Sequence, residues 1–214
     1  MDKDNLSIIV VQNLLQINAI KINAQNPFTW ASGIISPIYC DNRLTLSEIS
    51  VRKIIKEGLA ELTKSYKFDV IAGVATAGIP HGALVADYLG VPFIYIRDKA
   101  KSHGKKNQIE GRLLEGQKVL LVEDLISTGG SSLKAVEAVR EFGNEVVGVI
   151  AIFSYGFQAA NINFEKSDCS FSTLSDYHIL LQEALALNII DADSIATLEK
   201  WSVDPANWFT SINN

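Results

Sequence analysis

VLLVEDLISTGGSS, residues 119–132, is the stretch that decides the fold. It opens with consecutive apolar residues, which is typical of a strand buried on both faces of a parallel sheet. Two carboxylates, Glu123 and Asp124, follow at the expected end of that strand, and a Gly/Ser/Thr loop comes next. Apolar positions then recur at helical spacing in LKAVEAVREFG, residues 133–143. The stretch therefore predicts a strand, an acidic pair, a small-residue loop and a helix, in that order.

This order of elements predicts an anion-binding site. Ligands of open α/β sheets lie beyond the carboxyl ends of the strands, and glycines let the backbone approach a ligand closely. The N–H groups and the positive end of the helix dipole attract a phosphate, and Ser127, Thr128, Ser131 and Ser132 add hydroxyl donors. The adjacent acids suit sugar hydroxyls or a magnesium shell. The implied ligand carries a phosphate and a ribose diol together.

Two other phosphate loops and a plain turn are the alternatives. A Walker loop needs a lysine after its last glycine, but Gly130 is followed by serine. A dinucleotide fingerprint needs G-x-G-x-x-G, whereas the glycines here are adjacent. An ordinary strand-to-helix turn with a Ser or Thr cap is the remaining alternative. The acids at the strand end argue against it.

Apolar strands alternate with helical patterns along the chain, which predicts an α/β fold with a doubly wound parallel sheet. The expected strands cover residues 68–74, 91–96, 119–122 and 145–153, with a weak edge strand within 164–174. The expected helices cover residues 6–15, 47–66, 83–90, 133–143, 176–187 and 191–201. Short β pieces and turns within residues 19–43 predict a small antiparallel cap.

The chain is expected to form a single domain over residues 1–214. Residues 1–45 are expected to form mainly the cap, residues 46–155 the core, and residues 156–214 a C-terminal edge with helices. Hydrophobic residues make up 48% and charged residues 20% of the chain, which separates it from a disordered one. A net charge of −5 argues against a general nucleic-acid binder.

The start of the chain carries no cationic leader, and no apolar run approaches the roughly 20 residues of a transmembrane helix. We therefore expect a cytoplasmic protein without a membrane contact. Cys40 and Cys169 are too few for a disulfide framework or a zinc site, which fits a reducing compartment.

Residues 98–109 are expected to form a mobile, cationic lid loop. Between Arg97 and Arg112, six cations face two anions, a local excess in an acidic chain. Apolar residues are almost absent there, so core burial cannot hold the loop. A solvated hairpin tip is the structural alternative, because runs of charged residues usually form solvated surface segments. The phosphate loop favours a lid that closes on a polyphosphate.

The stretch at residues 119–132 resembles the phosphoribosyl diphosphate (PRPP) motif of the type I phosphoribosyltransferases. Three further segments resemble the orotate phosphoribosyltransferases, especially the form found in Gram-positive bacteria: FTWASGIISPIYCDNR at 28–43, ATAGIPHG at 75–82 and KSHGKKNQIEG at 101–111. IAIFSYG at 150–156 agrees as well. The resemblance implies the type I phosphoribosyltransferase fold, with a hood built from N-terminal and C-terminal segments.

The implied reaction joins orotate and PRPP into orotidine 5′-phosphate and pyrophosphate, a step of de novo pyrimidine synthesis. Mg²⁺ is implied as the cofactor, carried by PRPP rather than bound directly by the protein. The implied assembly is a homodimer in which the lid loop reaches the neighbouring active site. A purine phosphoribosyltransferase and a PRPP-sensing regulator without catalysis are the alternatives.

The resemblance also assigns roles to residues. It implies catalytic roles for Lys101, His103 and Asp124. The implied substrate-binding residues are Tyr39, Thr76, Ala77, Arg43, Arg97, Lys101, His103, Glu123, Asp124, Leu125, Ile126, Ser127, Thr128, Gly129, Gly130 and Ser131. Glu123 and Asp124 are expected on the ribose hydroxyls, residues 127–131 on the 5′-phosphate, and Tyr39 with Cys40 in the base pocket.

This chain departs from the family pattern at a few positions. Many orotate enzymes carry lysines where this chain has Ala31 and Ala77, and an arginine near Tyr155. Those cations help to hold pyrophosphate or the orotate carboxylate. The partner of the carboxylate is therefore left open, with Arg43 and Lys21 as the candidates.

Overall fold

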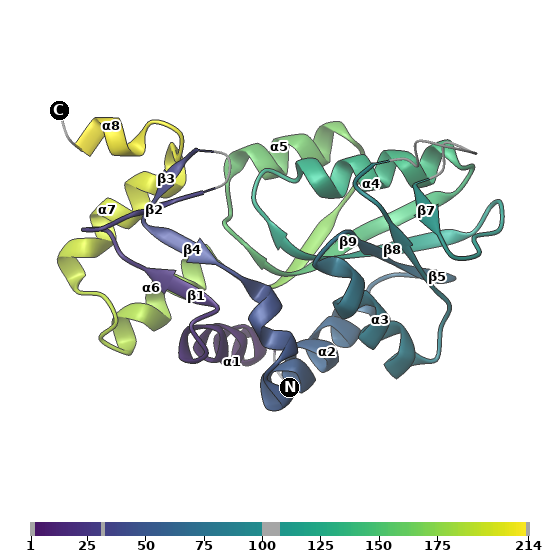
Figure 1. Ribbon diagram of the computed structural model, residues 1–214, viewed down its shortest axis with the longest axis horizontal. Coiled ribbons are helices and arrows are strands. Elements are labelled where there is room, and N and C mark those ends of the chain that lie inside the picture. The colour runs from purple at the N-terminus through teal and green to yellow at the C-terminus, as the bar shows by residue number, and fades with distance from the viewer. Residues whose placement is uncertain (1–2, 31–32, 100–107, 213–214) are drawn as a thin grey trace.

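The computed structural model describes residues 3–30, 33–99 and 108–212 (Figure 1). Its main feature is a sheet of six strands in the order β10-β9-β8-β5-β6-β7. Five strands run parallel to their neighbours, and β7 pairs antiparallel with β6. The strands are β5 (Val70–Val74), β6 (Phe93–Ile96), β7 (Ile109–Glu110), β8 (Lys118–Ile126), β9 (Glu145–Ser154) and β10 (Phe171–Asp176). The predicted doubly wound parallel sheet is confirmed.

Helices cover both faces of this sheet (Figure 1). One face carries α1 (Lys3–Gln16), α2 (Ile49–Thr63) and α3 (Gly78–Leu89), and the other carries α4 (Gly130–Glu141) and α5 (Gln158–Lys166). Along β8, Leu120 and Val122 pack with the first set, while Val119 and Leu121 pack with the second. This alternation follows from the two-residue period of a strand, which sends successive side chains to opposite faces.

The hood stands beside one end of the sheet (Figure 1). Its N-terminal part holds the antiparallel pairs β1 (Ile20–Ile22) with β4 (Ile38–Cys40) and β2 (Phe28–Thr29) with β3 (Ile35–Ser36). The 3-10 helix η1 (Asn42–Leu46) leads from it into α2. Its C-terminal part holds α6 (Tyr177–Ala186), α7 (Ala192–Val203) and α8 (Trp208–Ile212). The predicted hood of N-terminal and C-terminal segments is confirmed.

Three details of the predicted elements were wrong. β8 continues through the acidic pair to Ile126, because β9 pairs with it as far as Ser154. Residues 158–166 form α5, which the sequence pattern did not indicate. The expected edge strand is confirmed as β10, which lies at the edge of the sheet and pairs parallel with β9. Ile109, expected in the lid loop, is buried in β7 opposite Ile96. The rest of that loop, residues 100–107, lies outside the described residues.

Capping side chains fix the ends of two hood helices. Asp176 accepts a hydrogen bond from the backbone N–H of Ile179, and Asp191 accepts one from that of Ser194. Both carboxylates are side-chain caps of their helices. Among the described helices, none combines the length and apolar content needed to cross a membrane.

Candidate active site

A polar cavity of about 340 Å³ lies beyond the carboxyl ends of β5 and β8. It is bounded by the loop before α3, the end of β8, the start of α4 and the turn after β4. The residues that line it are Cys40, Asp41, Arg43, Ala75, Thr76, Ala77, Glu123, Asp124, Leu125 and Ser131. This is the edge at which parallel α/β sheets bind their ligands.

The acidic pair forms one wall of the polar cavity. Glu123 is 4% exposed, and its carboxylate accepts hydrogen bonds from the Asp124 backbone N–H at 3.0 Å and the Ser131 hydroxyl at 3.3 Å. The Ser132 hydroxyl donates to the same carboxylate at 3.4 Å. Burial, together with the charge of Asp124, raises the pKa of Glu123 well above its ordinary value. Burial raises the pKa of Asp124 as well. A ligand that donates hydroxyl groups is therefore suited to this wall.

The loop between β8 and α4 is held from outside by α5. The Asn163 side-chain amide donates to the Thr128 carbonyl at 3.0 Å. Gly129 has φ +82°, and a Cβ atom there would lie 2.6 Å from the Phe164 ring. Glycine is required at this position on both counts. Gly129 also precedes the first residue of α4 and has no side chain to cap it, so the helix N-terminus stays open to an anion.

The loop before α3 lies close to β8 because of two glycines. A Cβ atom on Gly78 would collide with the Val122 carbonyl oxygen, and one on Gly73 would lie 2.7 Å from Ile79 Cα. The small residues let the start of α3 approach the central strand. Thr76 and Ala77 consequently face the acidic pair across the polar cavity. The peptide bond between Ala75 and Thr76 is cis.

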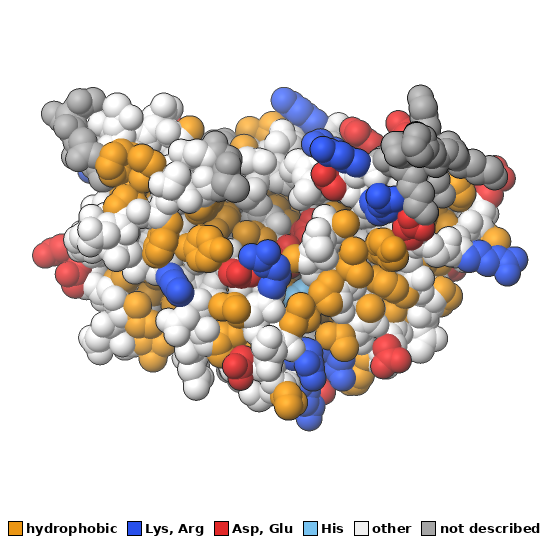
Figure 2. All heavy atoms as spheres, in the orientation of Figure 1, with side chains coloured by type: hydrophobic (Ala, Val, Ile, Leu, Met, Phe, Trp, Pro, Cys, Tyr) orange, Lys and Arg blue, Asp and Glu red, His pale blue; other side chains and the backbone are white. Residues whose placement is uncertain are grey.

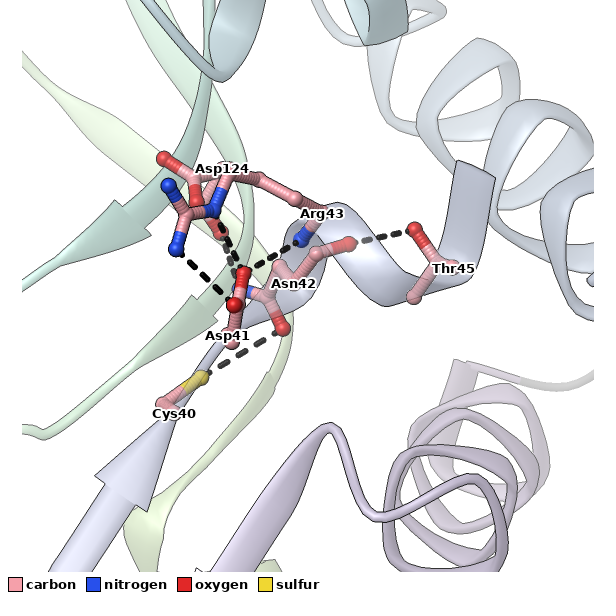
Figure 3. Close-up of polar contacts among 6 residues, drawn as sticks. All are labelled: Cys40, Asp41, Asn42, Arg43, Thr45 and Asp124. Carbon is pink, nitrogen blue, oxygen red and sulfur yellow. Dashed lines mark hydrogen bonds and ion pairs between the residues drawn. The ribbon is translucent and has the colours of Figure 1, made fainter. Parts of the chain in front are cut away.

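The turn after β4 carries the remaining polar groups (Figure 3). Arg43 and Asp41 form a two-pronged ion pair, with Nε–Oδ1 at 2.6 Å and Nη2–Oδ2 at 2.8 Å. The hydrogen bond from Arg43 lowers the pKa of Asp41. The Arg43 side chain is 64% exposed and lines the polar cavity.

A second cavity of about 200 Å³, the aromatic cavity, adjoins the first. The residues that line it are Trp30, Tyr39, Cys40, Leu125, Ser127 and Tyr155. Trp30 and Tyr155 stack with ring centroids 5.1 Å apart, and Trp201 of α7 packs edge-on against both. The Trp30 indole N–H donates to the Ile38 carbonyl at 2.9 Å. The size and aromatic walls suit a flat heterocycle.

The two cavities share Cys40 and Leu125. Burial raises the pKa of the Cys40 thiol, with added contributions from the charges of Asp124 and Asp41, so the thiol stays protonated. A flat ring in the aromatic cavity and a sugar in the polar cavity would therefore meet across a short apolar wall.

Most of the residues expected at the site come together here. The polar and aromatic cavities are lined by Tyr39, Arg43, Thr76, Ala77, Glu123, Asp124, Leu125, Ser127 and Ser131. Thr128, Gly129 and Gly130 form the loop beside them. Arg97 lies at a small neighbouring cleft with Ser131 and Lys134, and its guanidinium is 3.5 Å from the Glu110 carboxylate.

Some expected residues lie elsewhere. Ile126 is fully buried in the core and lines neither cavity. Lys101 and His103 lie outside the described residues, as does Ala31. Of the carboxylate candidates, Arg43 is engaged with Asp41, and Lys21 is an exposed residue of β1 opposite Tyr39.

Sequence reasoning missed Asn42 and Trp201 as parts of the site. Ser132 was expected as a donor to the ligand, whereas its hydroxyl donates to Glu123. His81 is buried in α3. Burial lowers its pKa to about 4.

Residues 42–184 match the family model of the phosphoribosyl transferase domain. The fold and the site thus define a type I phosphoribosyltransferase. The orotate phosphoribosyltransferase of Cytophaga hutchinsonii is 51% identical over 93% of this chain and 96% of its own, and that of Enterococcus faecalis is 53% identical over the same shares. The chain belongs to the orotate phosphoribosyltransferases, which join orotate to the phosphoribosyl group of PRPP in pyrimidine synthesis.

Solved structures agree with this family. Leishmania donovani UMP synthase is 29% identical with a TM-score of 0.78, and the match covers 91% of this chain and 42% of that one. Aeropyrum pernix orotate phosphoribosyltransferase is 26% identical with a TM-score of 0.73, and the match covers 85% and 99% of the two chains.

Proposed function

We propose that the chain divides its two substrates between the two cavities, with PRPP across the polar cavity and orotate in the aromatic cavity. The single observation that carries this proposal is their common wall at Cys40 and Leu125. A ring nitrogen on one side and the ribose C1 on the other come within reach of each other there. Holding two reactants in this way accounts for a large part of many enzymatic rate accelerations.

The 5′-phosphate is assigned to the loop of Ser127, Thr128, Gly129, Gly130 and Ser131. The left-handed backbone of Gly129 and the open N-terminus of α4 support this assignment. Glu123 and Asp124 are assigned to the ribose hydroxyls, which donate to carboxylate oxygens. Ser131 contributes to both, since its hydroxyl donates to Glu123 while its backbone N–H lies in the first turn of α4.

The diphosphate is assigned to the opposite side of the polar cavity. Thr76 and Ala77 precede α3, whose N-terminus favours an anion. Arg97, Lys101 and His103 supply positive charge from the neighbouring strand and the lid loop. Their charges stabilise the leaving group as negative charge develops on it.

Magnesium fits the site as a partner of PRPP. The described residues include no group of three or more His, Cys, Asp or Glu side chains suited to hold a metal, while Glu123 and Asp124 offer two adjacent carboxylates. These two would face the ion through the ribose hydroxyls. When bound, the ion neutralises charge on the diphosphate.

Bond cleavage leaves positive charge on the ribose, as in glycosidic cleavage. The Asp124 carboxylate lies on the polar side of the common wall, where it stabilises that charge. The orotate ring nitrogen forms the new bond to C1 as the bond to the diphosphate oxygen breaks. This scheme needs no protein nucleophile and no general base.

We further propose a cytoplasmic homodimer in which residues 98–108 of one subunit close over the active site of its partner. Closure excludes water from PRPP and prevents its hydrolysis. Lys101→Ala should then lower kcat far more than it weakens orotate binding. An unchanged kcat would remove the lid from the mechanism.

A direct assay tests the proposed substrate. Purified protein with PRPP and Mg²⁺ is offered orotate, hypoxanthine, xanthine or adenine, and consumption of each base is followed by its absorbance. Consumption of orotate alone is the expected result. Consumption of a purine would favour a purine phosphoribosyltransferase, and PRPP binding without turnover of any base would favour a PRPP-sensing regulator.

A further inference from the structure

Asn42 is a buried polar residue at the junction between the hood and the central strand. It is 1% exposed and opens η1, directly after β4. Burial of an amide is costly unless its donors and acceptors are paired. The partners of this side chain therefore indicate what it does.

The side chain of Asn42 bonds to both sides of the common wall (Figure 3). Its Nδ2 donates to the Asp124 carbonyl oxygen at 2.8 Å. Its Oδ1 accepts from the Cys40 thiol at 3.4 Å. The Thr45 hydroxyl donates to the Asn42 carbonyl oxygen at 2.6 Å and fixes the backbone of the turn.

The chemistry of these partners fixes the orientation of the amide. A carbonyl oxygen only accepts, and a protonated thiol donates. Burial raises the pKa of the Cys40 thiol and keeps it in the donor form. A flipped amide would turn Oδ1 toward the Asp124 carbonyl oxygen and lose both bonds.

Asn42 contacts β8 at the point where this strand has only one neighbouring strand. β5 pairs with β8 only as far as Val122, while β8 continues to Ile126 with β9 on its other side. The acidic pair therefore lies where β8 has lost one neighbouring strand. The Asn42 amide supplies the hydrogen bond that the Asp124 carbonyl receives from the hood.

We propose that Asn42 is a positioning residue for the transfer reaction, acting through Asp124 and Cys40. It holds the end of β8 against β4, so that the polar and aromatic cavities keep their common wall and the two substrates keep their separation. This inference rests on the proposed division of substrates between the cavities. It assigns Asn42 no contact with either substrate.

The neighbouring ion pair of Arg43 and Asp41 does not hold the end of β8 against the hood. Arg43 and Asp41 bond to each other within the same turn, and the Arg43 side chain is 64% exposed. Their hydrogen bonds stay within this turn, and Arg43 acts on Asp124 through its charge, which opposes the rise that burial causes in the pKa of that carboxyl. Asn42 is the side chain among these three that bonds to the central strand.

Asn144 offers a matched control. It is likewise buried, at 7% exposed, and it likewise accepts and donates: Oδ1 accepts from the Gln117 backbone N–H, and Nδ2 donates to the Phe142 carbonyl oxygen. It precedes β9, at the opposite end of the sheet from the cavities. Its loss should affect stability without affecting substrate geometry.

The experiment compares Asn42→Ala and Asn144→Ala with the wild type. The KM values of PRPP and orotate, kcat and the thermal midpoint are measured for each. A purely structural role lowers kcat through the active fraction and leaves both KM values alone. A positioning role raises both KM values, because both cavities depend on the shared wall.

We expect Asn42→Ala to raise the KM of each substrate about tenfold, as for a lost buried hydrogen bond. Asn144→Ala should lower the thermal midpoint with both KM values within about twofold of the wild type. If Asn42→Ala does not fold, the milder Asn42→Ser decides by the same KM criterion. KM values for Asn42 variants that match those of Asn144→Ala would overturn the inference. An inactive wild type would instead overturn the proposed function.

Discussion

The two cavities of the site are neighbours with opposite chemistry. The polar cavity is lined by carboxylates, the hydroxyls of Thr76 and Ser131 and the ends of two helices, while the aromatic cavity is lined chiefly by Trp30, Tyr39 and Tyr155. The first is built on the carboxyl edge of the sheet. The second takes Trp30, Tyr39 and Cys40 from the hood, and its other half from the end of β8, the loop after it and the residue after β9.

The fold thus offers one cavity suited to a charged ligand and another suited to a flat ring. In the proposed division of substrates, the sheet edge holds the charged, flexible substrate by polar groups whose positions the strands fix. The hood side would hold the flat substrate by shape, with Trp201 of α7 packed against Trp30 and Tyr155. Figure 2 shows hydrophobic side chains gathered over the hood and over the α3 side of one face, with charged side chains between them.

The strongest test of the polar side is Asp124→Asn. Loss of the charge removes charge-assisted hydrogen bonds to ribose and stabilisation of positive charge, so kcat/KM for PRPP should fall about 100-fold. Orotate binding, measured by calorimetry, should change little. Asp69→Asn is the control, because Asp69 accepts the Lys118 N–H at the far end of β8. An equal loss of affinity for both substrates would contradict the assignment of PRPP and orotate to separate cavities.

Gly129→Ala tests the phosphate loop. An added Cβ would lie 2.6 Å from the Phe164 ring at φ +82°, and such overpacking costs about 1–3 kcal/mol. The affinity for PRPP should fall by about tenfold or more. Gly116→Ala is matched in backbone angle, at φ +80°, but its Cβ meets no atom within 4 Å. If both variants lose the same affinity for PRPP, the cause is backbone strain in general and not the contact with Phe164.

Trp30→Ala tests the aromatic side. It removes the ring stacked on Tyr155, and loss of such a stack should raise the KM of orotate about tenfold. The KM of PRPP should stay near the wild-type value. Phe209→Ala, also an aromatic change in the hood, should leave both values unchanged. A rise in the KM of PRPP alone would contradict the assignment of this cavity.

Glu123→Gln sharpens the contrast through pH. Burial raises the pKa of Glu123 above its ordinary value of 4.5, so the folded protein binds a proton that the unfolded chain releases. The contribution of Glu123 to the stability of the protein is therefore fully present below the pKa of the unfolded chain. It is lost as the pH rises through the pKa of the folded protein.

The glutamine variant does not titrate at this position. Without PRPP, its thermal midpoint should match the wild type near pH 4 and exceed it increasingly at higher pH, while its affinity for PRPP falls. Thermal melts at several pH values measure this, with the exposed Glu145→Gln as the control. A difference in thermal midpoint that stays constant across pH would show that the buried charge of Glu123 is not its cause.

The polar side could be predicted from sequence because its signal is local. A buried strand, two acids and a glycine-bearing loop before a helix stand within residues 119–132. The chemistry of each part is carried by neighbouring residues. The extension of β8 through the acids was not visible, because it depends on pairing with β9.

The aromatic side could not be predicted in the same way. Trp30, Tyr155 and Trp201 come from distant parts of the chain, and no local spacing links them. Asn42 bonds to Asp124 across 82 positions. α5 was missed because its inward face consists mainly of Ala160 and Phe164, too few apolar positions to mark a helix.

A crystal structure with orotidine 5′-phosphate tests at once whether the phosphate loop holds a ribose phosphate and whether the hood side holds the pyrimidine. We expect the phosphate against residues 128–131, the ribose hydroxyls at Glu123 and Asp124, and the ring between Tyr39 and Tyr155. A phosphate bound away from that loop, or a ring outside the aromatic cavity, would contradict it.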